Sequence, residues 1–186
     1  AADIAPGLLR RRFGFERWRQ HRPETWEELR AEALARRRPE AVSPGRFRGY
    51  DRDQTAVRAA LANSGRCSVG DHIVFERREL AQCPKASEPQ GLVLVNPPYG
   101  VRLEEVASLE PTYALLGAKL MECFPGWEAG VFTGNPPLGR ALRLRAYRSH
   151  TFFNGPIECR LLRFELQPGT VEPDPETVRR NRLEAA

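Results

Sequence analysis

The chain has 186 residues, of which 41% are hydrophobic and 28% charged, a composition typical of a globular domain and not of a disordered segment. No run approaches the roughly 20 apolar residues of a membrane span, and the basic first twelve residues lack the apolar region of a signal peptide. We therefore expect a cytoplasmic protein with no membrane partner. The scattered cysteines and histidines do not have the spacing of a zinc site, so we predict no metal.

The net charge of +5 is concentrated near the start of the chain. Residues 1–48 hold twelve arginines against seven acidic residues, whereas the remainder is balanced. Of the 29 basic residues, 27 are arginine, which a GC-rich coding sequence would explain and which is also compatible with an RNA partner. Because the chain begins with Ala1 and has a single methionine, Met121, we interpret it as an internal fragment.

The first predicted elements are a basic, aromatic stretch and a helix. Arginines alternate with aromatic residues over residues 10–22, which would suit binding to RNA or a solvated loop anchored to the core by its rings. Thr25 and Glu28 have the spacing of a capping box, so we expect a helix over residues 25–38 with Thr25 as its N-cap.

Two short strands, each followed by an acidic residue, come next. Residues 47–50 form a predicted strand that leads into Asp51, and Asp53 would cap the following helix, which ends near Gly65. Apolar residues lie on one face of that helix: Val57, Ala60 and Leu61. A carboxylate after such a strand can accept hydrogen bonds from ribose hydroxyls, and we favour Asp51 for this role. A second strand begins at residue 73 and leads to Glu79, which would accept from an adenine amino group or form an exposed turn.

The central feature of the sequence is an apolar strand that ends in a proline corner. Residues 92–95 read Leu-Val-Leu-Val, a pattern typical of a strand buried on both faces of a parallel sheet. Asn96-Pro97-Pro98-Tyr99 follows directly, and the prolines stiffen the exit from the sheet. The side-chain oxygen of Asn96 and the backbone oxygen of Pro97 could accept both hydrogens of an exocyclic amine, while Tyr99 stacks on its ring.

A nitrogen held in this way can attack an activated methyl group, with the rate coming from orientation and fixed dipoles. The structural alternative is that Pro-Pro only makes a rigid exit from the strand. The position of the tetrapeptide directly after a buried strand favours a catalytic role for Asn96, Pro97, Pro98 and Tyr99. We also assign Asn96 to the cofactor site.

The rest of the chain predicts alternating elements and then a hairpin. We expect a helix over residues 105–124, a strand over 130–133, a helix over 136–147 and two strands around Asn154-Gly155. No acidic residue occurs between Glu128 and Glu158, whereas basic residues are frequent there. We predict that four arginines bind RNA: Arg102, Arg140, Arg143 and Arg145.

The tetrapeptide resembles the catalytic motif of S-adenosylmethionine-dependent amino-methyltransferases, which act on adenine, cytosine, guanine or glutamine amide nitrogens. The longer run NPPYGVRL, from Asn96 to Leu103, is similar to THUMP-associated RNA guanine methyltransferases, and to RlmL-type enzymes of large-subunit ribosomal RNA in particular. Further matching segments occur in order: AADIAPGL, GFERW, GYDRD, FERREL, FPGW, FTGNPPLG and FFNGPIECRL.

This resemblance implies an α/β fold, the class I S-adenosylmethionine-dependent methyltransferase (Rossmann-like) sheet with a C-terminal antiparallel hairpin. It implies that residues 1–167 are a partial catalytic domain and that residues 168–186 are a tail or interdomain linker. The first strand and the Gly-rich loop of that family are absent from this chain, so we expect the sheet to lack a central strand and the fragment alone to be inactive.

The resemblance also implies the reaction and the partners. S-adenosyl-L-methionine would be the cofactor and the 2-amino group of a guanine in 23S ribosomal RNA the acceptor, as in an RNA (guanine-N2-)-methyltransferase. An upstream THUMP domain and a downstream second methyltransferase domain would belong to the same polypeptide. Two alternatives stay open, an adenine or glutamine amino-methyltransferase and a non-catalytic RNA-binding fragment.

Overall fold

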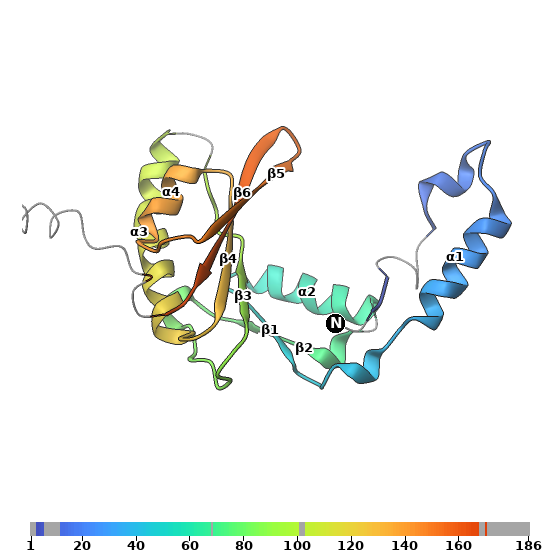
Figure 1. Cartoon of the computed structure of the whole chain (residues 1–186), viewed down its shortest axis with the longest axis horizontal. Helices are drawn as coiled ribbons and strands as arrows, with labels where there is room; N and C mark the ends of the chain where they lie inside the picture. The colour runs from blue at the N-terminus through green and yellow to red at the C-terminus, as the bar shows by residue number, and fades with distance from the viewer. Residues whose placement is uncertain (1–2, 6–11, 68, 101–102, 168–169, 171–186) are drawn as a thin grey trace, which may run out of the picture. The chain divides into compact units, whose positions relative to one another are not determined.

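The structure is a computed structural model that describes residues 3–5, 12–67, 69–100, 103–167 and 170 (Figure 1). It divides into two compact units, Ala1–Glu79 and Leu80–Ala186. The predicted tail, residues 168–186, lies outside the described residues except for Thr170. No helix among the described residues is both long and apolar enough to cross a membrane.

Among its described residues, the first unit contains two α-helices, two strands and three short 3-10 helices. In chain order these are η1 (Gly14–Arg17), α1 (Pro23–Ala35), η2 (Pro39–Ala41), β1 (Phe47–Asp51), α2 (Gln54–Arg66), η3 (Gly70–His72) and β2 (Ile73–Arg77). Strands β1 and β2 pair in parallel, with Phe47 opposite Ile73 and Asp51 opposite Arg77. The predicted order of strand, acidic residue, helix and strand is therefore confirmed.

Helix α1 begins earlier than the sequence predicted. Its N-cap is Arg22, with Pro23 in the first turn, so Thr25 lies inside the helix and is not the cap. Proline fixes φ near its helical value and needs no N–H partner in the first turn, which explains the early start. Helix α2 has the predicted cap, because the Asp53 side chain accepts a hydrogen bond from the Thr55 backbone N–H at 2.7 Å. Leu61, expected to face the core, is 48% exposed.

The aromatic residues before α1 pack against one another. The rings of Phe13 and Phe15 stack at 5.4 Å, and each meets the Trp26 ring edge-on, at 5.5 and 4.9 Å. These contacts connect the segment around η1 to α1 and not to the core that the structural alternative expected, since η1 and α1 contain no buried residue. Trp18 remains 69% exposed.

The described part of the second unit is a four-stranded sheet with two α-helices and a short 3-10 helix. In chain order its elements are η4 (Leu80–Gln82), β3 (Leu92–Val95), α3 (Leu103–Cys123), β4 (Glu128–Thr133), α4 (Pro136–Ala141), β5 (Arg148–Asn154) and β6 (Ile157–Glu165). The strand order is β3-β4-β6-β5. Strand β3 pairs in parallel with β4, and β6 pairs antiparallel with both β4 and β5. The predicted mixed sheet with a C-terminal hairpin is confirmed.

The core of this unit lies between the sheet and its two helices, which Figure 1 shows on one side of the strands. Tyr113 and Leu120 of α3 are at most 1% exposed, as are Leu138 of α4 and Val131 and Phe164 of the sheet. The apolar face predicted for the helix over residues 105–124 is therefore confirmed.

Strand β3 has one bare face, contrary to the prediction that both its faces are buried. Val93 and Val95 pack on the core, whereas Leu92 is 58% and Leu94 68% exposed. Successive side chains point to opposite faces of a strand, and among the described residues of this unit α3 and α4 cover only one face. Within the described chain β3 pairs only with β4, and β1 only with β2.

Helix α4 is shorter than the sequence predicted. It ends at Ala141 and not near Tyr147, with Leu142 as its C-cap and Arg143 at a φ of +55°. A left-handed residue just after a helix ends it, because the next N–H groups turn back toward the last carbonyls. The backbone N–H of Arg143 accordingly donates to the carbonyl of Arg140 at 3.0 Å.

We predict that Gly117→Ala destabilises the fold, because α3 and α4 meet at this glycine. An added Cβ would overlap the carbonyl oxygen of Leu142 and lie 2.8 Å from its carbonyl carbon. Overpacking of this kind costs about 1–3 kcal/mol of unfolding free energy. Thermal unfolding of the whole protein that the gene encodes, called the gene product below, would measure this loss. Gly65→Ala in α2 is the matched control, since its Cβ would meet nothing within 4 Å. Equal melting temperatures for the two variants would contradict the prediction.

Candidate active site

The proline corner lies at the carboxyl end of β3, as predicted. Asn96 and Pro98 are exposed, Pro97 is buried and Tyr99 is half-buried. Within the part of the chain that the structure describes, the Asn96 side chain has no hydrogen-bond partner. Its amide is therefore available to a ligand. Gly100 follows at a φ of +53°, in the left-handed region that favours glycine.

The Tyr99 ring is held by residues from the next strand and from the hairpin. A Cβ on Gly134 would lie 2.7 Å from Cε2 of Tyr99 and 3.1 Å from Cγ2 of Ile157, so the ring lies directly on the glycine backbone. The Nδ2 of Asn154 donates a hydrogen bond to the Tyr99 hydroxyl at 3.0 Å. The corner and the hairpin turn are thus in direct contact.

A buried hydrogen-bond network supports the loop that follows β4. The Thr133 hydroxyl donates to the carbonyl of Asn135 at 3.3 Å, and it accepts from the Asn135 N–H at 3.1 Å. The Tyr113 hydroxyl lies 3.0 Å from the same oxygen and must be the donor, because the Thr133 proton is already used. Burial raises the pKa of the Tyr113 phenol above its usual value, although the hydrogen bond with Thr133 opposes this shift.

A second Asn-Pro-Pro sequence follows β4 and has a different role. The Asn135 side chain caps α4 by accepting from the Leu138 N–H at 3.4 Å, and the two prolines occupy the first turn. The tripeptide after β3 is instead followed by Tyr99. Its asparagine, Asn96, is exposed and does not cap a helix. The two occurrences show that Asn-Pro-Pro by itself does not define a catalytic corner.

The two predicted cofactor carboxylates lie in the first unit, each near the carboxyl end of a parallel strand. Asp51 is the last residue of β1, and its Oδ1 accepts from the Asp53 N–H at 2.8 Å. The Arg78 N–H donates to the Asp51 carbonyl, also at 2.8 Å. These contacts fix the Asp51 backbone and one carboxylate oxygen, while the exposed side chain leaves the second oxygen accessible. Glu79 is exposed two residues after β2.

Three of the four predicted RNA-binding arginines, Arg140, Arg143 and Arg145, are exposed. Arg140 is in α4, and Arg143 and Arg145 lie in the segment between α4 and β5. Among the described residues none of these three forms an ion pair. Arg102 lies outside the described residues.

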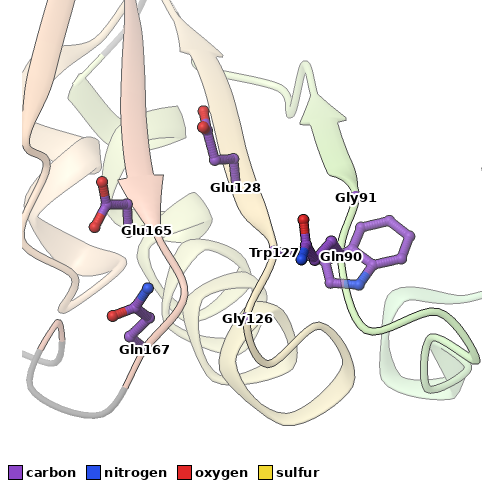
Figure 2. A pocket seen from close by; sticks show the side chains of 7 residues that line it. All are labelled: Gln90, Gly91, Gly126, Trp127, Glu128, Glu165 and Gln167. Atoms are coloured by element: carbon purple, nitrogen blue, oxygen red, sulfur yellow. The ribbon is translucent and has the colours of Figure 1, made fainter.

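A cavity of about 470 Å³ lies at the amino ends of β3 and β4, whereas the proline corner follows the carboxyl end of β3 (Figure 2). It is lined by Gln90, Gly91, Gly126, Trp127, Glu128, Glu165 and Gln167. Arg163 donates to Glu128 at 2.6 Å and holds the pKa of that carboxyl below its usual value, with a further hydrogen bond from Tyr147. The acidic lining does not suit a phosphate backbone, and we assign this cavity no part in the chemistry.

Sequence reasoning missed the residues that support Tyr99. Gly134 and Asn154 approach it from segments 35 and 55 positions along the chain. Their motifs, FTGNPPLG and the Asn154-Gly155 turn, indicated a family match and a hairpin but no contact with Tyr99. The order and direction of the strands could have indicated these residues. Because β3, β4 and β5 all run in the same direction, their carboxyl ends bring Asn96, Gly134 and Asn154 to one edge of the sheet.

Comparisons with known proteins agree with this geometry. A protein-family profile described as "RMKL-like, methyltransferase domain" matches residues 1–163. A protein of Allochromatium vinosum named "Ribosomal RNA large subunit methyltransferase K/L" is 51% identical over 169 residues, which are 90% of this chain. The chain spans only 23% of the length of that relative.

Solved methyltransferase structures have the same fold. A possible methylase from Clostridium difficile 630 matches with a TM-score of 0.76 and 25% identity, over 94% of this chain and 43% of the other. A putative methyltransferase complexed with SAH matches with a TM-score of 0.74 and 23% identity, over 88% of this chain and 42% of the other. The predicted class I methyltransferase fold is thereby confirmed.

Proposed function

The chain belongs to the RMKL-like methyltransferase domain family, and on that premise we propose that it is the catalytic part of an enzyme that methylates the 2-amino group of a guanine in 23S ribosomal RNA. The observation that carries this proposal is the exposed, unpartnered amide of Asn96 beside the fixed ring of Tyr99. The name of the relative, a large-subunit ribosomal RNA methyltransferase, supports the substrate class.

The corner binds and orients the base. The Asn96 Oδ1 and the Pro97 carbonyl accept the two hydrogens of the amino group, which keeps its lone pair out of conjugation with the ring. Tyr99 stacks on the base and sets its plane. When bound, S-adenosyl-L-methionine supplies an activated methyl group, and these residues contribute orientation and fixed dipoles, with no general base of shifted pKa.

Asp51 and Glu79 fit the polar groups of this cofactor. The Asp51 Oδ1 accepts from the Asp53 N–H, which fixes the direction of the carboxylate. The other carboxylate oxygen is accessible and can accept from ribose hydroxyls. Glu79 can accept from the adenine amino group. The SAH bound by a structural relative supports the choice of cofactor. Since the sequence contains no Gly-rich loop, we expect the 186 residues alone to bind the cofactor weakly and to be inactive.

We further propose that residues 1–167 act as part of a larger catalytic assembly on one polypeptide. An upstream THUMP domain would deliver RNA, and residues 168–186 would link to a second methyltransferase domain. The small share of the relative that this chain spans supports such an arrangement. A ribosomal RNA substrate would place the protein in the cytoplasm.

Asn96→Ala should lower the methylation rate of the gene product at least about 100-fold, the scale for losing one preorganised polar partner of the reacting group. Folding should be unaffected, because the residue is exposed and buries no apolar area. Transfer of labelled methyl groups to large-subunit ribosomal RNA measures the rate. Asn63→Ala, an exposed asparagine in α2, is the control. Near-normal turnover of Asn96→Ala would refute the mechanism.

The nucleoside product of the same assay distinguishes the acceptors. Digestion of the labelled RNA should release N2-methylguanosine. N6-methyladenosine, or label on a glutamine of a protein substrate, would replace the proposal by the adenine or glutamine alternative. A gene product that binds RNA but transfers no methyl group would favour the non-catalytic fragment.

Asp51→Asn should weaken cofactor binding by about 10-fold or more, since hydrogen bonds to charged groups contribute about 1.5–3 kcal/mol. Calorimetric titration of the gene product with S-adenosyl-L-methionine measures the dissociation constant. Asp53→Asn is the matched control, because asparagine caps helices as well as aspartate does. Unchanged affinity in Asp51→Asn would remove this residue from the cofactor site.

Replacing Arg140 and Arg143 together by alanine should reduce RNA affinity and its salt dependence. Each lost phosphate contact lowers the slope of log K against log salt by about 0.7 for single-stranded RNA. Arg30 and Arg36 are the control pair, since they already bind Glu27, Glu32 and Asp3. Filter binding at several salt concentrations measures the slopes. Equal slopes for both pairs and for the wild type would contradict the assignment.

A further inference from the structure

The Tyr99 ring is fixed on two sides by residues that have no role in the proposal above. The Gly134 backbone lies against the ring, because any Cβ there would be 2.7 and 2.8 Å from its Cε2 and Cδ2 atoms. The Asn154 amide holds its hydroxyl at 3.0 Å. A tyrosine held both along the Cδ2–Cε2 side of its ring and at its hydroxyl has little freedom to rotate.

Each of these supports is itself anchored. Gly134 lies between Thr133 and Asn135, which are hydrogen-bonded to each other. The Thr133 hydroxyl is also hydrogen-bonded to Tyr113, and these bonds hold the loop. Thr133 and Tyr113 are both fully buried. The loop therefore cannot shift without breaking hydrogen bonds inside the core, and such bonds are costly to leave unpaired.

The hairpin turn supplies the second anchor. Asn154 is the last residue of β5 and pairs with Ile157 at the start of β6. Gly155 then takes a φ of +61°, which a residue with a Cβ rarely adopts. The tight turn sets where the Asn154 side chain lies, and Ile157 packs against the position above Gly134. The turn and the loop thus meet at the same ring.

We infer that Asn154 and Gly134 are positioning residues for methyl transfer, which act through the plane of the Tyr99 ring. This inference rests on the proposed function, in which Tyr99 stacks on the base and so sets the direction of the amino nitrogen. An error of about 1 Å in such a placement can cost about 100-fold in rate. Neither residue needs to touch the RNA for this effect.

A double-mutant cycle between Asn154 and Tyr99 tests the inference. In the gene product, Asn154→Leu should lower kcat about threefold to tenfold, the range expected for one neutral hydrogen bond. Tyr99→Phe keeps the ring and removes the same bond. The double variant should then be no slower than Tyr99→Phe alone. Additive losses would overturn the inference, because Asn154 would be acting independently of the Tyr99 hydroxyl.

Asn154→Asp separates positioning from a general structural role. A carboxylate can accept from the Tyr99 hydroxyl, so the bond survives with its direction reversed and kcat should return toward the wild-type value. The KM for RNA should rise, because the new charge repels phosphate. A kcat as low as that of Asn154→Leu would overturn the inference. Asn63→Leu, on α2, is the control for an exposed asparagine and should leave both constants unchanged.

Gly134→Ala tests the support beneath the ring. We expect a loss in kcat of about tenfold to 100-fold, with the dissociation constant for S-adenosyl-L-methionine unchanged. Gly14→Ala is the control, since its Cβ would meet nothing within 4 Å. Wild-type kcat in both Gly134→Ala and Asn154→Leu would overturn the inference while the proposed function stands. A wild-type gene product that methylates no amino nitrogen would overturn both.

Discussion

The parallel pairing of β3 with β4 is the constraint on which the candidate site depends. It places the end of each strand at one edge of the sheet, and the hairpin then returns β5 to that edge. Asn96 is exposed there, while Tyr113 and Thr133 are buried beneath the next loop. The exposed amide of Asn96 therefore lies next to a loop that buried hydrogen bonds hold in place. Such preorganisation is what orientation-driven chemistry requires.

Much of the fold follows from local sequence signals. The apolar run of β3, the long amphipathic helix α3 and the Asn-Gly turn of the hairpin have short-range patterns that the structure confirms. The early start of α1 depends on Pro23 overriding a capping box, and the early end of α4 on the left-handed conformation of Arg143. In both cases neighbouring residues favour different helix ends, and the sequence pattern alone does not decide between them.

The candidate site follows from the sequence only in part, for a similar reason. Asn96 and Tyr99 are recognisable because a rare tetrapeptide follows an apolar strand, and Asp51 because it ends the first strand of a strand-helix-strand unit. Gly134 and Asn154 approach Tyr99 only through long-range strand pairing. The second Asn-Pro-Pro sequence makes the same point, because its asparagine is a helix cap. The residues proposed to contact the base thus lie in one short motif, whereas the residues that hold Tyr99 in place come from distant parts of the chain.

The bare side of β3 has a practical consequence for handling these residues. Two leucines are exposed on the strand, and among the described residues its outer hydrogen-bonding edge has no partner. An apolar strand with a free edge is a template for pairing with other molecules. Preparations of the isolated polypeptide are thus inclined to self-associate as concentration rises. Loss of soluble material would then report on intermolecular strand pairing and not on a failure of the domain to fold.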